Sequence, residues 1–465
     1  MPEALRGTPG RFQIGIYCNI GRSMDASAFG MEVWCHQLSR FLGKKVVCSS
    51  HNSPRYLLYD VNPPEGFNLR RDVYMRVAQL VKKLRKDDPG HNWTLVLPPW
   101  GPLYHWGPEA SDQLPWSHFF HLDSLRRYVP LLELDDFLNE HGPHLDGIYY
   151  LQYPSDMADN MLDTFHPDNC TQHMPYFELA DRRFYGHFWG YTDMSASSLT
   201  CLSVLGSSTS MASFLQTLPE QVTLLDRAET LLHPSYGDAE FWAVRRSMRL
   251  SPAIVAVGDD FRREHLNSTD VGDETLMEDD WVTARSFHPA LGGPYLAVHL
   301  RRQDFVSSRA AQVPSLAAAA TQIDALLSKL GLNLVFIATD APEEVFYPHC
   351  VELIHIFVVT TFCQCIGVLT TEFQELQSLV REGTVLRFEP RVGDDWLGPG
   401  GVAAVDQWIC AHGRYFLGTY ESTFSFRIME EREILGFPAD STFNRLCGDL
   451  ESCEQPTRWR IQYPS

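Results

Sequence analysis

Two adjacent arginines, Arg301 and Arg302, follow an apolar run from Tyr295 to Leu300. Such a run fits a strand buried on both faces of a parallel sheet, and ligands in open α/β sheets bind beyond the carboxyl ends of the strands. A guanidinium there can hold a diphosphate through two parallel hydrogen bonds. A surface ion pair between arginine and Asp304 explains the same residues equally well. The pattern alone leaves both interpretations open.

A second candidate for chemistry is Glu65, in a loop that follows an expected strand, Arg55–Tyr59. Apolar residues at helical spacing across 73–84 predict a helix after this loop. Prolines fix the loop backbone, Gly66 permits close approach of a ligand, and Asn68 is expected to cap the helix. A carboxylate in such a rigid loop can act as a general base. A capping or solvated glutamate is the more common use of this position.

Near the C-terminus, Ser422 and Thr423 begin a predicted helix. Hydroxyl groups and the first backbone N–H groups of a helix together form a binding site for phosphate. An ordinary Ser/Thr cap is the favoured interpretation of this segment taken by itself. The acidic run 430–433 in the same helix is expected to be a solvated face.

The elements that would position these groups form two βαβ units. In the first, strands Arg55–Tyr59 and Trp93–Leu97 enclose the helix that follows Glu65. In the second, strand Tyr295–Leu300 is followed by a helix closed by Gly331 and then by strand Leu334–Thr339. Two such units, far apart in sequence, predict an α/β protein with two Rossmann-like domains.

Other segments are assigned by periodicity alone. Leu224–Leu232 and Ala239–Leu250 are predicted to be helices. Val402–His412 is predicted to be a helix and Tyr415–Gly418 a strand. The acidic stretch Asp270–Asp280 is expected to be a solvated loop between domains.

Composition excludes several classes of function. The 465 residues carry a net charge of −20, which argues against general binding to nucleic acid or to an anionic membrane. The uncharged stretch 353–371 is too polar for a convincing membrane span, so none is expected. Eleven cysteines are too few for a disulfide scaffold, and the first 50 residues have no convincing signal peptide.

Several long motifs closely resemble the protein O-fucosyltransferases that modify thrombospondin type 1 repeats. The motifs are Arg55–Asp72, Val298–Arg302, Gly401–His412, Ser422–Ile428 and Cys447–Trp459. The resemblance covers residues 55–343 and 373–463. It implies a GT-B-like fold, in which two Rossmann-like domains face each other across a cleft. The expected domains are 55–285, on the acceptor side, and 286–465, which would bind GDP-fucose.

The resemblance also implies roles for individual residues. The catalytic base falls on Glu65, and Arg301 and Glu431 are the other residues implied for catalysis, Glu431 in a supporting role. The residues implied for binding GDP-fucose are Pro64, Gly66, Phe67, Asn68, His299, Leu300, Arg301, Asp406, Ser422, Thr423 and Phe424.

The implied activity is inverting transfer of L-fucose from GDP-fucose to Ser or Thr hydroxyls of folded thrombospondin type 1 repeats, in the lumen of the endoplasmic reticulum. No cofactor is expected, and the sequence has no Asp-x-Asp metal motif. Disulfides are implied between Cys170 and Cys201 and between Cys447 and Cys453. Cys410, in an apolar helix, is expected to remain a free thiol.

Two segments depart from the family pattern. Residues 1–54 have no counterpart, and residues 344–372 are an atypical insertion directly after a strand of the donor domain. A protein that binds GDP-sugar or thrombospondin repeats without turnover is the alternative, should the insertion displace the donor site. A membrane protein that uses 353–371 as its span is a weaker alternative.

Overall fold

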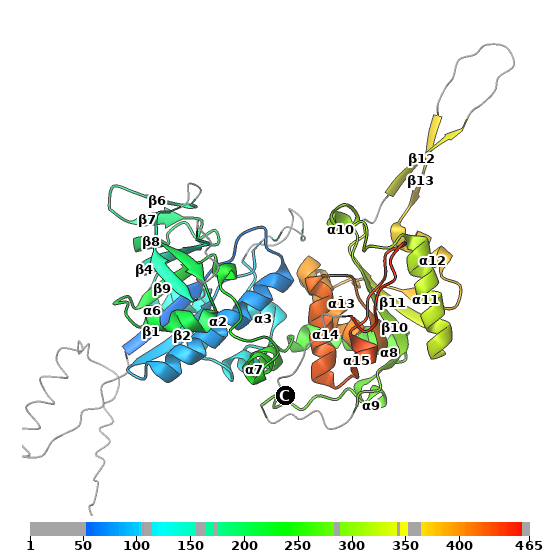
Figure 1. Ribbon diagram of the computed structural model, residues 1–465, viewed down its shortest axis with the longest axis horizontal. Coiled ribbons are helices and arrows are strands. Elements are labelled where there is room, and N and C mark those ends of the chain that lie inside the picture. Colours follow the sequence, from blue (N-terminus) through cyan, green and yellow to red (C-terminus); the bar gives the residue numbers. More distant parts are fainter. Residues whose placement is uncertain are drawn as a thin grey trace, which may run out of the picture. The chain divides into compact units, whose positions relative to one another are not determined.

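The computed structural model describes residues 53–101, 103, 106, 113–154, 163–170, 174–282, 289–341, 345–351 and 364–457, with backbone alone for 345–351 and 364–370. They belong to one compact unit, Ser53–Ser465, which contains two large sheets (Figure 1). The prediction of an α/β protein built on two sheets is confirmed.

The N-terminal sheet has nine strands around a parallel centre. The parallel strands lie in the order β3, β2, β1, β9, β4, β8. Short antiparallel strands β5, β6 and β7 extend it beside β8. The strands are β1 Ser53–Tyr59, β2 His91–Leu97, β3 Leu131–Glu133, β4 His144–Gln152, β5 Thr164–Pro167, β6 Tyr176–Glu178, β7 Phe184–Gly186, β8 Ser195–Leu205 and β9 Val222–Asp226.

The C-terminal sheet has four parallel strands in the order β14, β11, β10, β15. They are β10 Gly293–Leu300, β11 Leu334–Thr339, β14 Thr384–Leu386 and β15 Gly413–Leu417. The predicted strand before Arg301 is therefore the centre of this sheet, between β11 and β15. Its residues are buried on both faces, as the apolar run predicted.

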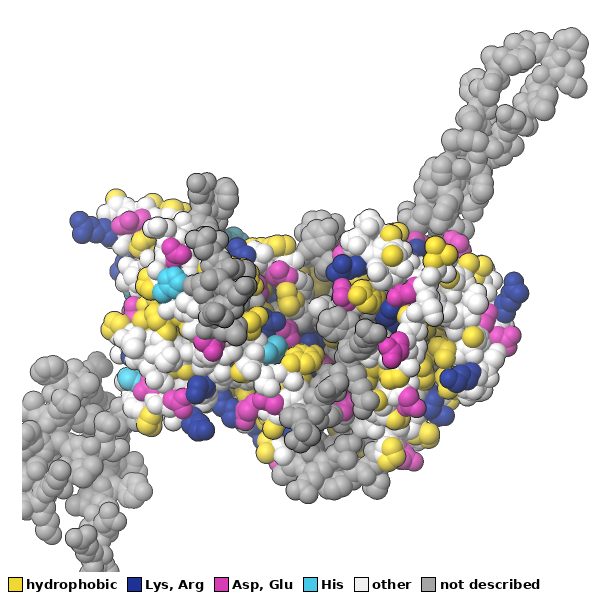
Figure 2. All heavy atoms as spheres, in the orientation of Figure 1, with side chains coloured by type: hydrophobic (Ala, Val, Ile, Leu, Met, Phe, Trp, Pro, Cys, Tyr) yellow, Lys and Arg dark blue, Asp and Glu magenta, His cyan; other side chains and the backbone are white. Residues whose placement is uncertain are grey.

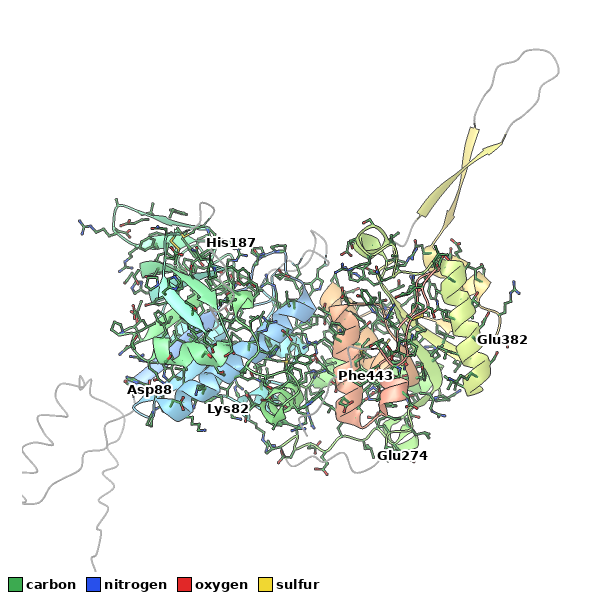
Figure 3. The ribbon with its side chains drawn as sticks, viewed as in Figure 1. Lys82, Asp88, His187, Glu274, Glu382 and Phe443 are labelled. Carbon is green, nitrogen blue, oxygen red and sulfur yellow. A yellow bond between two sulfur atoms is a disulfide. The ribbon has the colours of Figure 1, made fainter. Side chains whose placement is uncertain are left out.

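Helices cover the two sheets and contain most of the segments predicted to be helical. The principal ones are α2 Phe67–Asp87, α5 Leu134–His141, α7 Ala239–Ser247, α8 Pro252–His265, α10 Gln303–Ser308, α11 Leu316–Leu330, α12 Glu372–Leu379, α13 Gly398–His412 and α14 Thr423–Leu435. Shorter ones are α3 Trp116–Phe119, α4 Leu122–Arg126, α6 Ala212–Leu215, α9 Asp270–Asp273 and α15 Ala439–Thr442, with 3-10 turns η2 Ser208–Met211, η3 Ala228–Thr230 and η4 Asp395–Leu397. Figure 3 marks the end of α2 remote from Glu65 by Lys82 and Asp88.

Local signals explain where α11 begins and ends. The Ser315 hydroxyl accepts a hydrogen bond from the Ala318 N–H at 3.2 Å, which caps the first turn. Gly331 follows the last turn with φ 65°, a left-handed conformation that favours glycine. The predicted closure by Gly331 is confirmed.

The predicted helix Leu224–Leu232 is wrong. Val222–Asp226 is β9, and the chain then forms the turn η3. The strand lies between β1 and β4 and pairs with both, so tertiary pairing overrides the local helical pattern. The turn η3 carries Glu229, whose negative charge raises the pKa of Glu65.

One hydrophobic cluster joins both sheets and their helices: it contains Leu57 of β1 and Val73 of α2, together with Tyr295 of β10 and Ala404 of α13. Helix α8 precedes the expected domain boundary at 285/286 but packs on α13, where Trp408 Nε1 donates to Asp259 Oδ1 at 2.8 Å. The boundary itself stays a prediction.

The atypical insertion contains an antiparallel ribbon of two strands, β12 Val345–Val351 and β13 Gln364–Thr370 (Figure 1). Val345 pairs with Thr370, so the ribbon leaves and re-enters the domain at neighbouring points. Residues 352–363 lie outside the described residues. Because β10 still pairs with β11, and β11 with β14, the ribbon does not interrupt the sheet.

Two observations concern the surface charge and the helices. Basic and acidic side chains are interspersed on the described surface that Figure 2 shows, without a continuous basic area. Within the described ranges, no helix is long and apolar enough to span a membrane.

Both implied disulfides are confirmed, with Cα–Cα distances of 5.2 Å for Cys170–Cys201 and 5.6 Å for Cys447–Cys453. Cys410 is a buried free thiol, also as predicted.

We expect loss of the Cys170–Cys201 bridge to destabilise the protein more than loss of Cys447–Cys453. The first closes a loop with a sequence separation of 31 and the second one of 6. Chain entropy gives about 3–4 kcal/mol for the longer loop. Thermal melts of Cys170→Ser/Cys201→Ser and Cys447→Ser/Cys453→Ser variants measure the difference. A larger loss from the C-terminal pair would contradict this order.

Candidate functional site

The loop that carries Glu65 is built around one guanidinium, that of Arg70. Arg70 donates to four carbonyl oxygens of the loop: Glu65 at 2.9 Å, Val61 at 3.2 Å, Asn62 at 3.3 Å and Pro63 at 3.5 Å. Asp60, at the start of the loop, adds an ion pair to Arg70 at 3.7 Å. The backbone around Glu65 is therefore fixed by the helix that follows it, since Arg70 lies on the first turn of α2.

Glu65 is partly buried, and burial raises the pKa of its carboxyl group above the ordinary value. The negative charge of Glu229 raises this pKa further, while Arg70 and Arg227 lower it. A carboxylate with raised proton affinity is better able to remove a proton from a hydroxyl near neutral pH. The position therefore suits the predicted base.

The start of α2 corrects one prediction. Gly66, not Asn68, occupies the N-cap position, and no described side chain caps the helix. Asn68 lies inside the first turn, and its amide oxygen accepts from Gln407 Nε2 at 2.8 Å. Phe67 is 5% exposed and packs against Trp100, with ring centroids 4.8 Å apart. Its side chain is a core anchor, so only its backbone can meet a ligand. Pro64 is exposed in the turn before it.

Gln407 on α13 joins the first part of the site to the second. Its amide oxygen accepts from Arg71 Nη1 at 2.6 Å, and its amide nitrogen donates to Asn68 and, at 3.4 Å, to the Phe424 carbonyl. The starts of helices α2 and α14 are thus held to one side chain of α13.

His299 ends this chain of contacts at the end of β10. Its ring stacks on Phe424, with centroids 4.3 Å apart, and Nδ1 is 2.8 Å from Ser425 Oγ. Burial, followed by the charge of Arg301, lowers the pKa of His299 to about 3, so the ring is neutral. Leu300, the next residue, is a core side chain that is 2% exposed.

Thr419 fixes the backbone at the same point. Its hydroxyl donates to the His299 carbonyl at 2.7 Å and accepts from the Arg301 N–H at 3.0 Å. Its own N–H donates to Ser425 Oγ at 2.9 Å. The turn after β10 is therefore tied to the beginning of α14.

Arg301 and Arg302 differ in their surroundings. Arg301 pairs with Asp304 at 2.6 Å and with Asp340 at 2.9 Å, and its side chain is 15% exposed. Arg302 is bound by Glu372 at 2.6 Å, and its N–H donates to Asp340 at 2.6 Å. The predicted ion pair with Asp304 is confirmed and is made by Arg301, whereas Arg302 pairs with Glu372. Contact of Arg301 with a diphosphate stays a prediction.

Asp340 lies shortly before the insertion, and Glu372 is its last residue. Since Asp340 binds both arginines and Glu372 binds Arg302, the root of the insertion is held to the turn after β10. The displacement on which the alternative function depends is not seen at this turn in the residues described.

The remaining predicted donor residues lie on α13 and α14. Ser422 is the buried N-cap residue of α14 and Thr423 is exposed in its first turn. On α13, burial raises the pKa of Asp406 well above its ordinary value, an effect that Arg387 partly offsets. Asp406 Oδ1 is buried and has no hydrogen-bond partner among the described residues. Such an oxygen fits an N–H donor of a ligand.

Glu431 belongs to an ionic network and not to the group around Arg301. It pairs with Arg245 of α7 at 2.8 Å, and Arg245 also pairs with Glu430 at 2.7 Å. Glu430 pairs with Arg427 at 2.9 Å, which in turn contacts Asp72 of α2 at 3.2 Å. The expected solvated face is wrong for Glu430, which is fully buried. Its partner on another helix accounts for the error.

Two acidic residues, Asp60 and Asp226, lie where strands β1 and β9 end. The Asp60 N–H donates to the Leu225 carbonyl, which sets Asp60 beside Asp226. Burial, followed by the charge of Asp60, raises the pKa of Asp226 to about 7. Between about pH 4 and pH 7, the native protein therefore holds a proton on the Asp226 carboxyl group. The unfolded chain, in which this pKa has its ordinary value of 3.8, has released that proton.

We expect Asp226→Asn to stabilise the protein at pH 8 more than at pH 5. Stability from the protonated Asp226 is complete below about pH 4 and is lost as pH rises through 7, whereas asparagine stays neutral. The gain at pH 8 has an upper limit of about 4 kcal/mol. Thermal melts at both pH values measure it, and a gain independent of pH would contradict the assignment.

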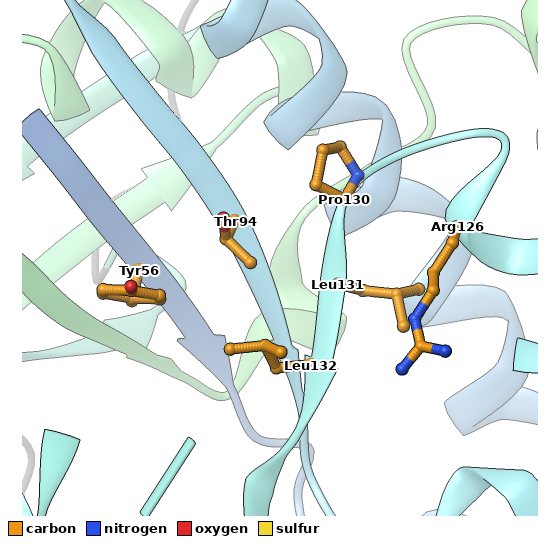
Figure 4. A pocket seen from close by; sticks show the side chains of 6 residues that line it. All are labelled: Tyr56, Thr94, Arg126, Pro130, Leu131 and Leu132. Carbon is orange, nitrogen blue, oxygen red and sulfur yellow. The ribbon is translucent and has the colours of Figure 1, made fainter. Parts of the chain in front are cut away.

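Two further observations concern other parts of the surface. A hollow of about 420 Å³ is lined by Tyr56, Thr94, Arg126, Pro130, Leu131 and Leu132, at the β1–β2–β3 edge (Figure 4). It contains no predicted site residue. In the part of the chain that the structure describes, no group of three His, Cys, Asp or Glu side chains is arranged to hold a metal.

Several residues of the site were not predicted from the sequence, among them Arg70, Arg245, Gln407, Thr419 and Asp340. Asp340 alone carried a signal, since it directly follows a buried strand, as Arg301 does. Arg70 acts on loop carbonyls five to nine residues before it, whereas Arg245, Gln407 and Thr419 act through partners far away in sequence.

The chain is similar to known fucosyltransferases in sequence and in fold. The sequence model of the family described as GDP-fucose protein O-fucosyltransferase matches residues 56–435. GDP-fucose protein O-fucosyltransferase 2 of Homo sapiens is 43% identical over 447 residues, covering 94% of this chain and 96% of the relative. The Caenorhabditis elegans protein of that name is 41% identical, covering 88% of this chain and 90% of the relative. A crystal structure of POFUT1 in complex with GDP-fucose superposes on this chain with a TM-score of 0.50 at 15% identity, covering 86% of this chain and 98% of that chain.

Proposed function

Because the chain belongs to the GDP-fucose protein O-fucosyltransferase family, we propose that it transfers L-fucose, with inversion, to Ser or Thr hydroxyls of folded thrombospondin type 1 repeats. It is a protein O-fucosyltransferase that uses GDP-fucose and has a GT-B-like fold. The acceptor and the stereochemistry are the proposed parts. The repeat is the acceptor implied by the sequence motifs.

In the proposed reaction Glu65 is the general base. Its carboxylate takes the proton from the acceptor hydroxyl as the hydroxyl oxygen bonds to C1 of fucose. The bond between C1 and the β-phosphate oxygen breaks on the opposite face, and GDP leaves with the electron pair. This displacement inverts the configuration at C1.

The departing diphosphate needs positive charge. Arg301, at the end of β10, and the first N–H groups of α14, after Ser422, are the groups we assign to this role. Asp406 is assigned to the guanine, whose N–H donors fit its buried oxygen without a described partner. Glu431 is assigned a supporting role through Arg245.

The observation that carries the proposal is the contact chain from Asn68 through Gln407 to Phe424 and His299. It joins the helix after Glu65 to the strand that ends at Arg301. A protein that only binds nucleotide has no need for a rigid, partly buried carboxylate on the acceptor side.

Mass spectrometry of a folded thrombospondin type 1 repeat, incubated with this protein and GDP-fucose, tests the function. We expect a mass increase of one fucose. An unfolded, reduced repeat is the control, and no modification of the folded repeat would reject the acceptor. We further propose that no cofactor is required, so transfer should continue in EDTA. A strict requirement for added divalent ion would reject that part.

The lumen of the endoplasmic reticulum is the proposed compartment. Both disulfides require an oxidising environment to form and persist. The proposed acceptor, a domain of secreted and cell-surface proteins, passes through the same compartment.

The alternative is a binding protein without turnover, whose donor site is displaced by the insertion. The proposed enzyme and this alternative predict different effects of removing the insertion. We expect replacement of residues 345–370 by a short Gly-Ser turn to leave transfer within about twofold of the unmodified chain, since closing so short a gap costs little. Val345 and Thr370 are already paired neighbours. Initial rates of both proteins measure this. An inactive chain that gains activity on deletion would support the alternative.

A further inference from the structure

Glu229 connects the loop that carries Glu65 to the turn after β9. Its side chain is 12% exposed, and each of its two oxygens has a separate partner. Oε2 accepts from the Asn62 N–H at 3.2 Å, and Oε1 accepts from Arg227 Nε at 3.1 Å. One carboxylate thus holds the backbone of the Glu65 loop and a neighbouring cation together.

Arg227 has a strained backbone, with φ 62° and ψ 41°. A side chain with a β-carbon keeps this left-handed conformation only where its surroundings impose it, and such positions concentrate at functional sites. Here the Arg227 N–H donates to Asp226 Oδ1 at 2.7 Å and Nη1 donates to the Tyr150 hydroxyl at 3.2 Å. These contacts, with Glu229, direct a guanidinium that is still 36% exposed.

Among the described residues, three charged groups shift the pKa of Glu65. They are Glu229 from η3, Arg227 from the residue before η3, and Arg70 from α2. Arg70 is held by four loop carbonyls and Asp60. Glu229 and Arg227 have opposite effects on Glu65, and they bind each other. Removing either one leaves the other uncompensated.

We propose that Glu229 and Arg227 are positioning residues for the Glu65 base, a pair of opposite charges that fixes its loop and sets the pH range in which it accepts a proton. The proposal rests on the proposed role of Glu65. It assigns a function to η3, which none of the sequence motifs covers.

The test compares pH profiles of kcat/KM for Glu229→Gln and Arg227→Asn, with GDP-fucose and a folded thrombospondin type 1 repeat. Glutamine keeps one oxygen acceptor without the charge, and asparagine tolerates the left-handed conformation. We expect the acidic limb to move to lower pH in Glu229→Gln and to higher pH in Arg227→Asn, each by about 0.5–1 pH unit. The KM for GDP-fucose should stay close to that of the wild type.

Asp226→Asn tests whether the limb belongs to Asp226 itself, whose pKa is raised to about 7 and is affected by Glu229. Asparagine keeps an oxygen that can accept from the Arg227 N–H. The acidic limb should persist in this variant. In the Glu65→Gln background, the limb should disappear and neither substitution should shift the residual rate.

Opposite shifts cannot arise from simple loosening of the loop. Shifts in the same direction, or lower kcat without a shift, would overturn the proposal while leaving Glu65 as the base. A limb that persists in Glu65→Gln would overturn the base assignment as well.

Discussion

Glu65→Ala is expected to lower the rate of fucose transfer by about 10²–10⁴-fold, the range typical for loss of a general base. The acceptor hydroxyl would then have to lose its proton to water while it attacks C1. Binding of GDP should hardly change, because the proposed base acts on the acceptor hydroxyl, and the loop residues implied for donor binding, Gly66, Phe67 and Asn68, are unchanged in this variant. Initial rates with a folded thrombospondin type 1 repeat and calorimetric titration with GDP measure the two quantities.

The matched control is Glu240→Ala, which removes an exposed carboxylate paired with Lys82 on the remote half of α2. It should leave both the rate and GDP binding unchanged. Full turnover by Glu65→Ala would place the base elsewhere. Loss of GDP binding in that variant would mean that the loop contributes to the nucleotide site through its side chain.

Arg301→Lys should lower the rate nearly as much as Arg301→Ala, by about 10²–10³-fold. Lysine keeps the charge but loses the planar fork, so it cannot replace two parallel hydrogen bonds to a diphosphate. In this structure the fork is bound by Asp304 and Asp340, which hold it in place at the end of β10. Steady-state kinetics for both substrates give the required comparison.

Asp304→Ala tests whether Asp304 positions the Arg301 guanidinium or competes with the diphosphate for it. Asp304 is the more exposed partner, with 47% of its side chain accessible, and a diphosphate can replace it on the guanidinium. The variant should retain most of its activity, while Asp340 still orients the arginine. Recovery of activity by Arg301→Lys would show that a point charge suffices, and the fork geometry would then be rejected.

The sequence predicted those parts of the fold that depend on local pattern. The buried run before Arg301, the helix closed by Gly331 and the unit around β1 and α2 were found because burial and capping leave a local signature. The segment Leu224–Leu232 shows the limit. Its apolar residues follow a helical spacing, yet pairing with β1 and β4 makes its first three residues part of a strand.

Prediction of the site had a similar limit. The motifs supplied Glu65, Arg301 and Asp406 through their resemblance to a family, but not the contacts that position them. Gln407 meets Asn68 across 339 residues of sequence, and Arg245 meets Glu430 across 185. Glu430 appears solvent-facing in an acidic run, and only the folded chain supplies its partners.

The ionic chain Glu431–Arg245–Glu430–Arg427–Asp72 also bears on how the protein unfolds. Its members come from helices α2, α7 and α14, and Glu430 and Arg245 are almost completely shielded from solvent. If α14 separated from α2 and α7, several charges would lose their partners before they regained water, at a cost of about 3–5 kcal/mol for a broken buried pair. Partial unfolding of one sheet alone is therefore disfavoured. The two sheets should melt in a single cooperative transition, although multidomain chains often unfold in stages.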